Sequence, residues 1–148
     1  MEYVMNTKKV MELIEKGSLD RELIDIYVDA EQLEYQKKRY VNAIMNFVEQ
    51  YGDGDIQIYS APGRSEIAGN HTDHQHGKVL ACAINKDAIG IVKKAKAEEV
   101  RIVSDGADEI VVDMADLGIR EEEKGTTLAL IKGVLAGFQE RGYKIGGF

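Results

Sequence analysis

The chain has 148 residues, of which 26 are acidic and 19 are basic, so its formal net charge is −7. This acidic balance excludes the basic surface that nucleic acid requires, and it disfavours an anionic membrane as a partner. The composition, 44% hydrophobic and 30% charged, is typical of a globular domain with a real core. One cysteine, no leader-like start and no membrane-length apolar run predict a cytoplasmic protein.

The first fifty residues have the apolar spacing of helices. One short stripe runs from Val10 to Ile14 and ends at Gly17, and a second includes Leu23 and Tyr27. A longer helix is expected after Asp29, with Gln32 completing a capping box. Its predicted buried face consists of Leu33, Tyr40, Ile44, Phe47 and Val48. The basic triplet Lys37, Lys38 and Arg39 is expected to lie in solvent.

After residue 51 the pattern changes to that of strands. Ile56 and Ile58 alternate with polar residues, and further short β-branched runs occupy 79–84, 87–93, 100–104 and 109–113. Their close spacing predicts an antiparallel meander. The segment 60–78 is predicted to be a loop, because it contains three glycines, the only proline and all three histidines.

The last part of the chain is expected to contain a helix over 126–141 that ends at Gly142, followed by the beginning of a strand at 144–148. One face of this helix is predicted to hold Leu130, Ile131, Val134, Leu135 and Phe138. The fold class is therefore α+β, with helices leading into a largely antiparallel sheet. We interpret 1–148 as one incomplete domain, with a helical lead-in over 1–50 and the sheet and following helix over 51–148.

The chemistry is concentrated in residues 61–77, which read Ala-Pro-Gly-Arg-Ser-Glu-Ile-Ala-Gly-Asn-His-Thr-Asp-His-Gln-His-Gly. Arg64 offers a rigid fork of donors, Asp73 accepts, and Asn70 and His71 can do both. A polyhydroxylated ligand needs such a mixture of donors and acceptors. One carboxylate can accept from two adjacent sugar hydroxyls, while the imidazole and the amide bind the others. Taken alone, Asp73 could equally be a turn-forming residue and Arg64 a surface residue.

This segment resembles the signature of the galactokinases, which are members of the GHMP kinase superfamily. The signature reads Gly-Arg-x-Asn-x-Ile-Gly-Glu-His-Thr-Asp-Tyr-x-x-Gly-x-Val-Leu. The positions that match in register are Gly63, Arg64, Gly69, His71, Thr72, Asp73, Gly77, Val79 and Leu80. The resemblance extends from about Ile56 to the end of the chain. It implies the amino-terminal half of the GHMP kinase fold, which is of the type called ribosomal protein S5 domain 2-like.

The resemblance implies an ATP-dependent kinase that phosphorylates galactose, or a close relative, at the anomeric hydroxyl, with Mg²⁺ as the metal. Asn70, His71 and Asp73 match positions that bind sugar hydroxyls. Arg64 matches an arginine beside the reacting hydroxyl, where a fixed cation stabilises developing negative charge. The phosphate loop and the catalytic aspartate are expected beyond residue 148, so this segment alone is predicted to be inactive. The sequence gives no signal for an oligomeric state.

Three departures from the signature bear on the site: Glu66 replaces an asparagine, Asn70 a glutamate, and His74 a tyrosine. These departures keep open a second function, a non-catalytic protein of the same fold that senses sugar and nucleotide. The histidine cluster with Asp73 and Cys82 also allows a zinc site, which we disfavour because the paired ligand spacing of zinc motifs is missing. Cys82 is expected to pack in the sheet as a small hydrophobic residue.

Overall fold

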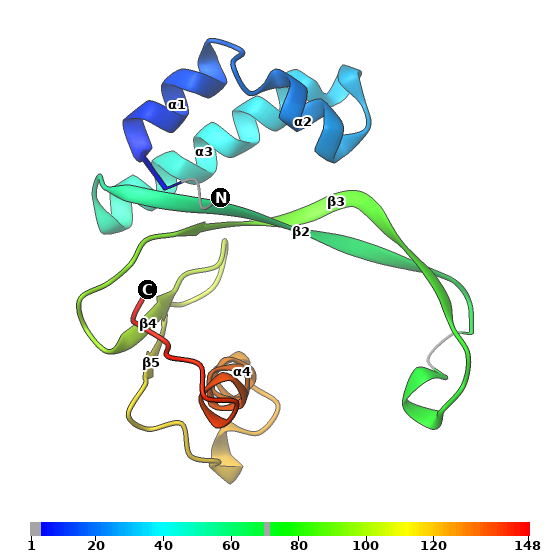
Figure 1. Ribbon diagram of the computed structural model, residues 1–148, viewed down its shortest axis with the longest axis vertical. Helices are drawn as coiled ribbons and strands as arrows, with labels where there is room; N and C mark the ends of the chain where they lie inside the picture. The colour runs from blue at the N-terminus through cyan, green and yellow to red at the C-terminus, as the bar shows by residue number, and fades with distance from the viewer. Residues whose placement is uncertain (1–3, 70–71) are drawn as a thin grey trace. The chain divides into compact units, whose positions relative to one another are not determined.

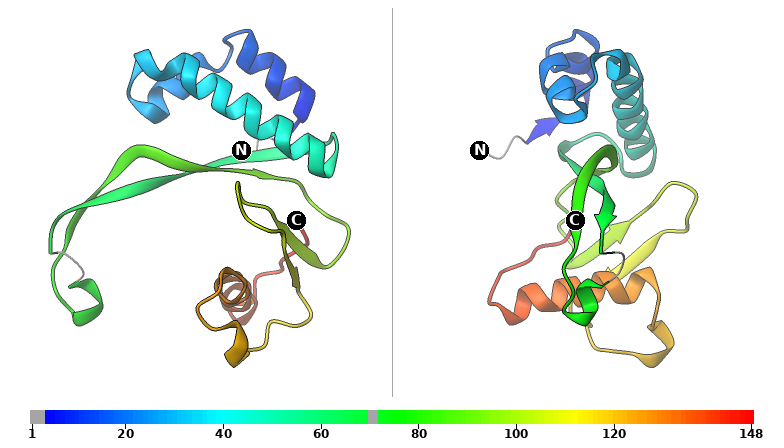
Figure 2. Two further views of the ribbon diagram at one scale, coloured as in Figure 1. Left: turned by 180° about the vertical axis from the view of Figure 1, so that it is seen from behind. Right: turned by 90° about the vertical axis from the view of Figure 1, so that its right-hand side faces the viewer.

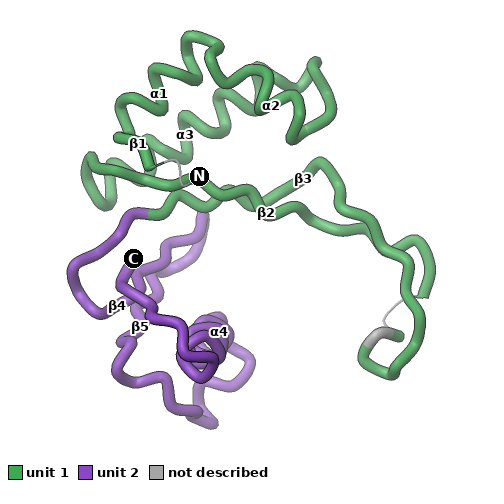
Figure 3. The backbone as a smooth tube through the Cα atoms, in the orientation of Figure 1, with its two compact units in different colours: residues 1–92 green, residues 93–148 purple. Residues whose placement is uncertain are grey.

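The computed structural model describes residues 4–69 and 72–148, which form an α+β fold as predicted (Figures 1 and 2). The chain divides into two compact units, residues 1–92 and residues 93–148 (Figure 3). Each unit has its own cluster of buried hydrophobic side chains. Within the described residues, no helix combines the length and the apolar character needed to cross a lipid bilayer.

Unit 1 contains three helices and a long β-hairpin. In chain order it has β1 (Met5–Asn6), α1 (Thr7–Glu15), α2 (Asp20–Tyr27), the 3-10 helix η1 (Ala30–Gln32), α3 (Leu33–Tyr51), β2 (Asp55–Ala68), the 3-10 helix η2 (Asp73–Gln75) and β3 (Leu80–Val92). The sheet order is β1-β2-β3, and both pairings are antiparallel. Strand β1 was not predicted from the sequence, because a strand of two residues shows no alternation.

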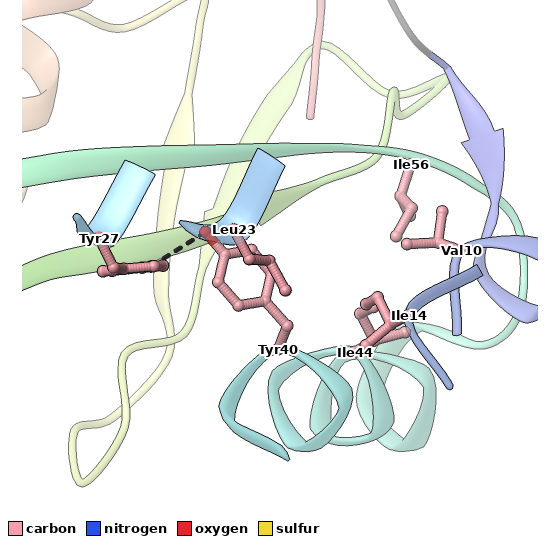
Figure 4. Close-up of a cluster of buried hydrophobic side chains, with 7 residues drawn as sticks. All are labelled: Val10, Ile14, Leu23, Tyr27, Tyr40, Ile44 and Ile56. Carbon is pink, nitrogen blue, oxygen red and sulfur yellow. Dashed lines mark hydrogen bonds between the residues drawn. The ribbon is translucent and has the colours of Figure 1, made fainter. Parts of the chain in front are cut away.

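The core of unit 1 lies between the helices and one end of the hairpin. Seven side chains are buried there: Val10, Ile14, Leu23, Tyr27, Tyr40, Ile44 and Ile56 (Figure 4). The helical spacing therefore identified the inner face of α3 correctly. Helix α2 ends at Val28, which has a left-handed backbone (φ 57°) although it is β-branched, and whose side chain is in solvent.

The hairpin has two halves with different surroundings. Its covered half, residues 55–60 and 87–92, lies under the helices of unit 1 (Figure 1). The remaining half, which we call the signature arm, comprises residues 61–69 and 72–86 and extends past those helices (Figure 1). Every side chain from Leu80 to Lys86 is exposed.

The prediction of a loop over 60–78 was wrong for residues 60–68, which continue β2. Two separate strands at 79–84 and 87–93 were also wrong, because β3 is continuous from Leu80 to Val92. Proline has no N–H to donate and glycine has no side chain to pack. Both are tolerated in a strand at a bulge, and proline also at an open edge. The predicted meander is in fact two separate sheets.

Unit 2 contains β4 (Glu99–Ile102), β5 (Ile110–Asp113), the 3-10 helix η3 (Glu121–Glu123) and α4 (Thr127–Glu140). Strands β4 and β5 are antiparallel, and α4 packs on them through Leu135, which is buried with Val100, Val112 and Met114. Thr126 caps α4 by accepting from the Ala129 N–H at 3.2 Å. Gly142 follows the helix with φ 78°, as expected for a stop.

Two details of unit 2 refine the prediction. The predicted inner face of α4 was wrong for Leu130, Val134 and Phe138, which are exposed, because the buried stripe lies over Leu128, Ile131 and Leu135. The final residues lie beside β4: the Phe148 N–H donates to the Glu99 carbonyl, and the Arg101 N–H donates to the Phe148 carbonyl. This bonding pattern is the one used by parallel strands.

Candidate functional site

The signature arm carries two irregularities in its pairing, one on each side of the segment Arg64–Glu66. Pro62 pairs with Asp87 and Arg64 with Ala83, so that Gly63 alone faces three residues of β3. A second shift follows Glu66, because Glu66 pairs with Ala81 while Ala68 pairs with Leu80. Bulges bend a strand and change the direction of its side chains. The backbone therefore kinks on both sides of the predicted catalytic arginine.

Arg64 lies on β2 between these bulges, and its side chain is exposed. Within residues 4–69 and 72–148, no hydrogen bond or ion pair holds its guanidinium. An arginine on a strand with all five donors uncommitted is available to a ligand. This geometry is compatible with the role that the resemblance implies.

The turn between β2 and β3 is organised by Thr72. Its hydroxyl donates to the Gly69 carbonyl at 2.7 Å, and its own carbonyl accepts from the N–H groups of Gln75 and Gly77. Gly69 has φ 96°, and a Cβ at Gly77 would lie 2.4 Å from the Thr72 side chain. Glycine is therefore required at both positions. In the His-Thr-Asp motif, the threonine acts on the backbone of the turn.

The three predicted sugar ligands are described only in part. Asn70 and His71 lie outside the described residues. Asp73 is the first residue of η2, and only its backbone is described. Their roles stay predictions, as does the role of Arg64.

Cys82 does not pack as a small hydrophobic residue: it is a free thiol and it is exposed on the signature arm, opposite Ser65. The prediction was wrong because it assumed that an apolar strand is covered. Among the residues that the structure describes, no group of three His, Cys, Asp or Glu side chains is arranged to hold a metal ion.

A polar cluster joins the helices to the hairpin just before the first bulge, and its centre is Asp87 on β3. The Asp87 carboxylate, only 3% exposed, accepts from Arg39, Ser60 and Tyr27, with the Tyr27 hydroxyl at 2.8 Å. Arg39 also donates to the Asp87 carbonyl at 2.6 Å. Asn85, inside the bulge, donates to the Tyr27 carbonyl at 3.4 Å. We call these five residues the Asp87 cluster.

The electrostatics of the Asp87 cluster follow from burial and hydrogen bonding. Burial alone would raise the pKa of the Asp87 carboxyl, but the hydrogen bonds from Ser60, Arg39 and Tyr27 outweigh it and hold the pKa below its usual value. Burial, followed by hydrogen bonding with Tyr40 and Asp87, raises the pKa of the Tyr27 phenol far above its ordinary value. Asp87 is therefore ionised and Tyr27 is a neutral donor near pH 7.

The Asp87 cluster was not predicted from the sequence, and the prediction that the basic triplet lies in solvent was wrong for two of its three residues. Arg39 is partly buried against Asp87, and Lys37, whose side chain is 15% exposed, pairs with Asp20 at 3.2 Å. Only Lys38 is in solvent. The available signal was the acidic residue at 87 inside a β-branched run, because a charge in the middle of a strand calls for a partner.

Comparison with known proteins links the signature arm to one family. The galactokinase galactose-binding signature matches residues 45–94, which include the end of α3 and the whole hairpin. The galactokinase of Clostridium tetani is 32% identical over 102 residues, covering 68% of this chain and 26% of the relative. The galactokinase of Enterococcus faecalis is 32% identical over 106 residues, covering 69% and 27%.

A solved structure shows the same fold. The crystal structure of Lactococcus lactis galactokinase complexed with galactose matches with a TM-score of 0.60 and 24% identity, over 70% of this chain and 27% of that one. The chain thus spans about a quarter of the length of these relatives. In sequence and in fold, the chain is similar to the amino-terminal part of a galactokinase, as its signature segment predicts.

Proposed function

We propose that this chain is the amino-terminal part of a galactokinase that transfers the γ-phosphoryl group of ATP to the anomeric hydroxyl of galactose. The complete kinase, meaning these residues joined to the remainder of a galactokinase polypeptide, is the catalytic species. The observation that carries the proposal is the match of the galactose-binding signature to residues 45–94. We also propose that 1–148 is one incomplete domain, and that it works in the cytoplasm, where the free thiol of Cys82 stays reduced.

The signature arm would supply the sugar half of the site. Asp73 would accept from two adjacent hydroxyls, and Asn70 and His71 would bind others. Arg64 would lie beside the anomeric hydroxyl, where its charge stabilises the alkoxide that develops and the charge on the transferring phosphoryl group. Because phosphoryl transfer depends on positioning and electrostatics more than on covalent catalysis, the position of this arginine in the complex with the sugar matters.

ATP and Mg²⁺ would be held mostly by residues outside this chain. A phosphate site of the usual kind needs a glycine-rich loop that leads into a helix, so that free backbone N–H groups point at the phosphate. Gly125 and Thr126 precede α4, but the Ala129 N–H at the start of this helix already donates to the Thr126 hydroxyl. Among the described residues, this helix start does not fit a triphosphate. The complete kinase would bind ATP through the remainder of its polypeptide. ATP would supply the phosphoryl group.

Two measurements of galactose-dependent ADP release test the proposal. The complete kinase should turn over, and the purified 148-residue chain should not. In the complete kinase, Arg64→Lys should lower kcat about ten- to a hundredfold with a smaller change in the KM for galactose, because lysine keeps the charge but loses the planar fork. An effect confined to KM would show that Arg64 only holds the substrate. Turnover by the isolated chain would contradict the division of the site.

A second function is favoured by Glu66, Asn70 and His74, which depart from the signature. A protein of this fold that binds galactose and nucleotide without turnover would tolerate such changes, since sensing needs no base on the sugar hydroxyl. Galactose binding by the complete polypeptide, measured by calorimetry, together with no ADP release at saturating ATP and Mg²⁺, would establish the sensor and reject the kinase.

A further inference from the structure

The Asp87 cluster lies where the covered half of the hairpin meets the signature arm. Its five members come from α2, α3, β2 and β3, so it joins both helices to both strands. Asp87 is the last paired residue of β3 before the bulge, opposite Pro62. Beyond it, the arm extends past the helices of unit 1, and Asn85 near its start still reaches the Tyr27 carbonyl at the end of α2 (Figure 1). The direction of the arm is therefore decided at this junction.

The bulge itself is fixed from two sides. Arg39 holds both the carboxylate and the carbonyl of Asp87, which pins the backbone at the start of the bulge. Asn85 then ties the middle of the bulge to the end of α2. Across from them, Gly63 leaves little spare space, since a Cβ there would lie 3.2 Å from the Lys86 carbonyl. A hairpin of two strands has no further strand to limit its bending. The bonds of Arg39 and Asn85 are therefore placed to set the angle between the covered half and the signature arm.

We propose that Asp87, held by Arg39, is a positioning residue that fixes the direction of the signature arm and thereby the position of Arg64. Arg64 follows the bulge by one residue on β2, so a change of angle at the bulge moves its guanidinium directly. A shift of about 1 Å in a catalytic group can cost about a hundredfold in rate. The catalytic consequence rests on the proposed kinase function, whereas the mechanical one does not.

The mechanical consequence can be measured with the single cysteine of the chain. Cys82 is exposed on the arm and takes one spin label, and Asn46→Cys on the outer surface of α3 takes the second. Both sites belong to unit 1. Pulsed electron–electron double resonance measures the distance between the two labels, and in the otherwise unaltered protein its distribution should be narrow. Asp87→Asn should broaden this distribution about twofold, because the arm becomes more mobile.

Two matched variants separate positioning from general stability. Ile44→Val weakens the core of unit 1 without touching the Asp87 cluster, and it should leave the distribution narrow. Ser60→Ala removes one donor to Asp87 but keeps the Arg39 pair, and it should broaden the distribution less than Asp87→Asn. If Asp87→Asn fails to fold, the Ser60→Ala variant provides the test. An unchanged distribution in the folded cluster variants, or equal broadening by Ile44→Val, would overturn the proposal.

The catalytic consequence is tested by a double-mutant cycle in the complete kinase. Asp87→Asn should lower kcat about tenfold, but less than about threefold when Arg64→Lys is already present, because the arginine that Asp87 positions has then already been removed. Fully additive effects would show that Asp87 does not act through Arg64, which contradicts the positioning role. If the unaltered kinase shows no galactose-dependent turnover, the proposed function fails, and the spin-label measurement still decides whether Asp87 positions the arm.

Discussion

The two halves of the hairpin in unit 1 consist of the same two strands and differ in nearly everything else. The covered half contributes Ile56 to a core shared with three helices, and it contains the buried carboxylate of Asp87. The signature arm is exposed along β3, is bulged twice, and carries the residues that match the galactokinase signature. The buried core and the residues that match the signature thus lie at opposite ends of one hairpin, with the Asp87 cluster at the boundary.

The signature arm has little core of its own, so its order depends on what it is attached to. Loops and strand ends gain precision from the rigid layer to which they are attached. Here the attachment consists of buried hydrogen bonds to a charged group, which contribute more than neutral ones. Substitutions in the covered half should therefore change stability, and those in the arm should change ligand binding.

The largest expected effect is on the stability of the core that the covered half shares with the helices, and it is tested on α3. Ile44 is fully buried, so Ile44→Ala should lower the free energy of unfolding by about 2–5 kcal/mol through the cavity it leaves. Leu80→Ala on the exposed arm is the matched control and should change it by less than about 0.5 kcal/mol. Urea denaturation measures both. Equal losses would show that the arm is part of the cooperative core.

The next effect is on sugar affinity in the arm. In the complete kinase, Asp73→Ala should weaken galactose binding by about 1.5–3 kcal/mol, because the carboxylate would accept from two hydroxyls. Gln75→Ala, an exposed neighbour in η2, should leave the affinity unchanged. Calorimetry that finds wild-type affinity in a folded Asp73→Ala variant would remove this residue from the site.

Acid should affect the covered half through Asp87. Its pKa is lower when the chain is folded, so its contribution to stability is present above the unfolded pKa and is lost as the pH falls through the folded pKa. The loss should therefore appear below about pH 4. Thermal unfolding followed from pH 6 to pH 2 should show a shallower decline for Asp87→Asn than for the wild type. Parallel curves would mean that another carboxylate dominates.

The smallest expected effect is on sugar preference. An amide at position 70 both donates and accepts, whereas the carboxylate of the family signature only accepts. Asn70→Glu in the complete kinase should raise the preference for galactose over 2-deoxygalactose or galactosamine a few-fold, about 1 kcal/mol or less. Ratios of kcat/KM for the three sugars measure it. Unchanged ratios would show that position 70 does not contact the sugar.

Local periodicity predicted the inner face of α3 but not that of α4, and the fixed motif predicted the family. The 3.6-residue spacing located Tyr40 and Ile44 in the core, and the signature segment led to the family that the comparisons support. The strand at 61–68 was missed because its polar and glycine residues show no alternation when neither face is covered. Arg39 and Asp87 lie 48 positions apart, so local reasoning on α3 placed the arginine in water.

Val28 shows that this fold sits below its own stability optimum. A β-branched residue in the left-handed region is sterically strained, and with an 85% exposed side chain it recovers little by packing. Selection removes only variants that fall under a working threshold, so such a cost can persist at the end of α2. Glycine at this position would relieve the strain, but it would also raise the conformational entropy of the unfolded chain. The free energy of unfolding should therefore rise by only about 0.5–1 kcal/mol. A thermostabilising programme for this chain would begin there.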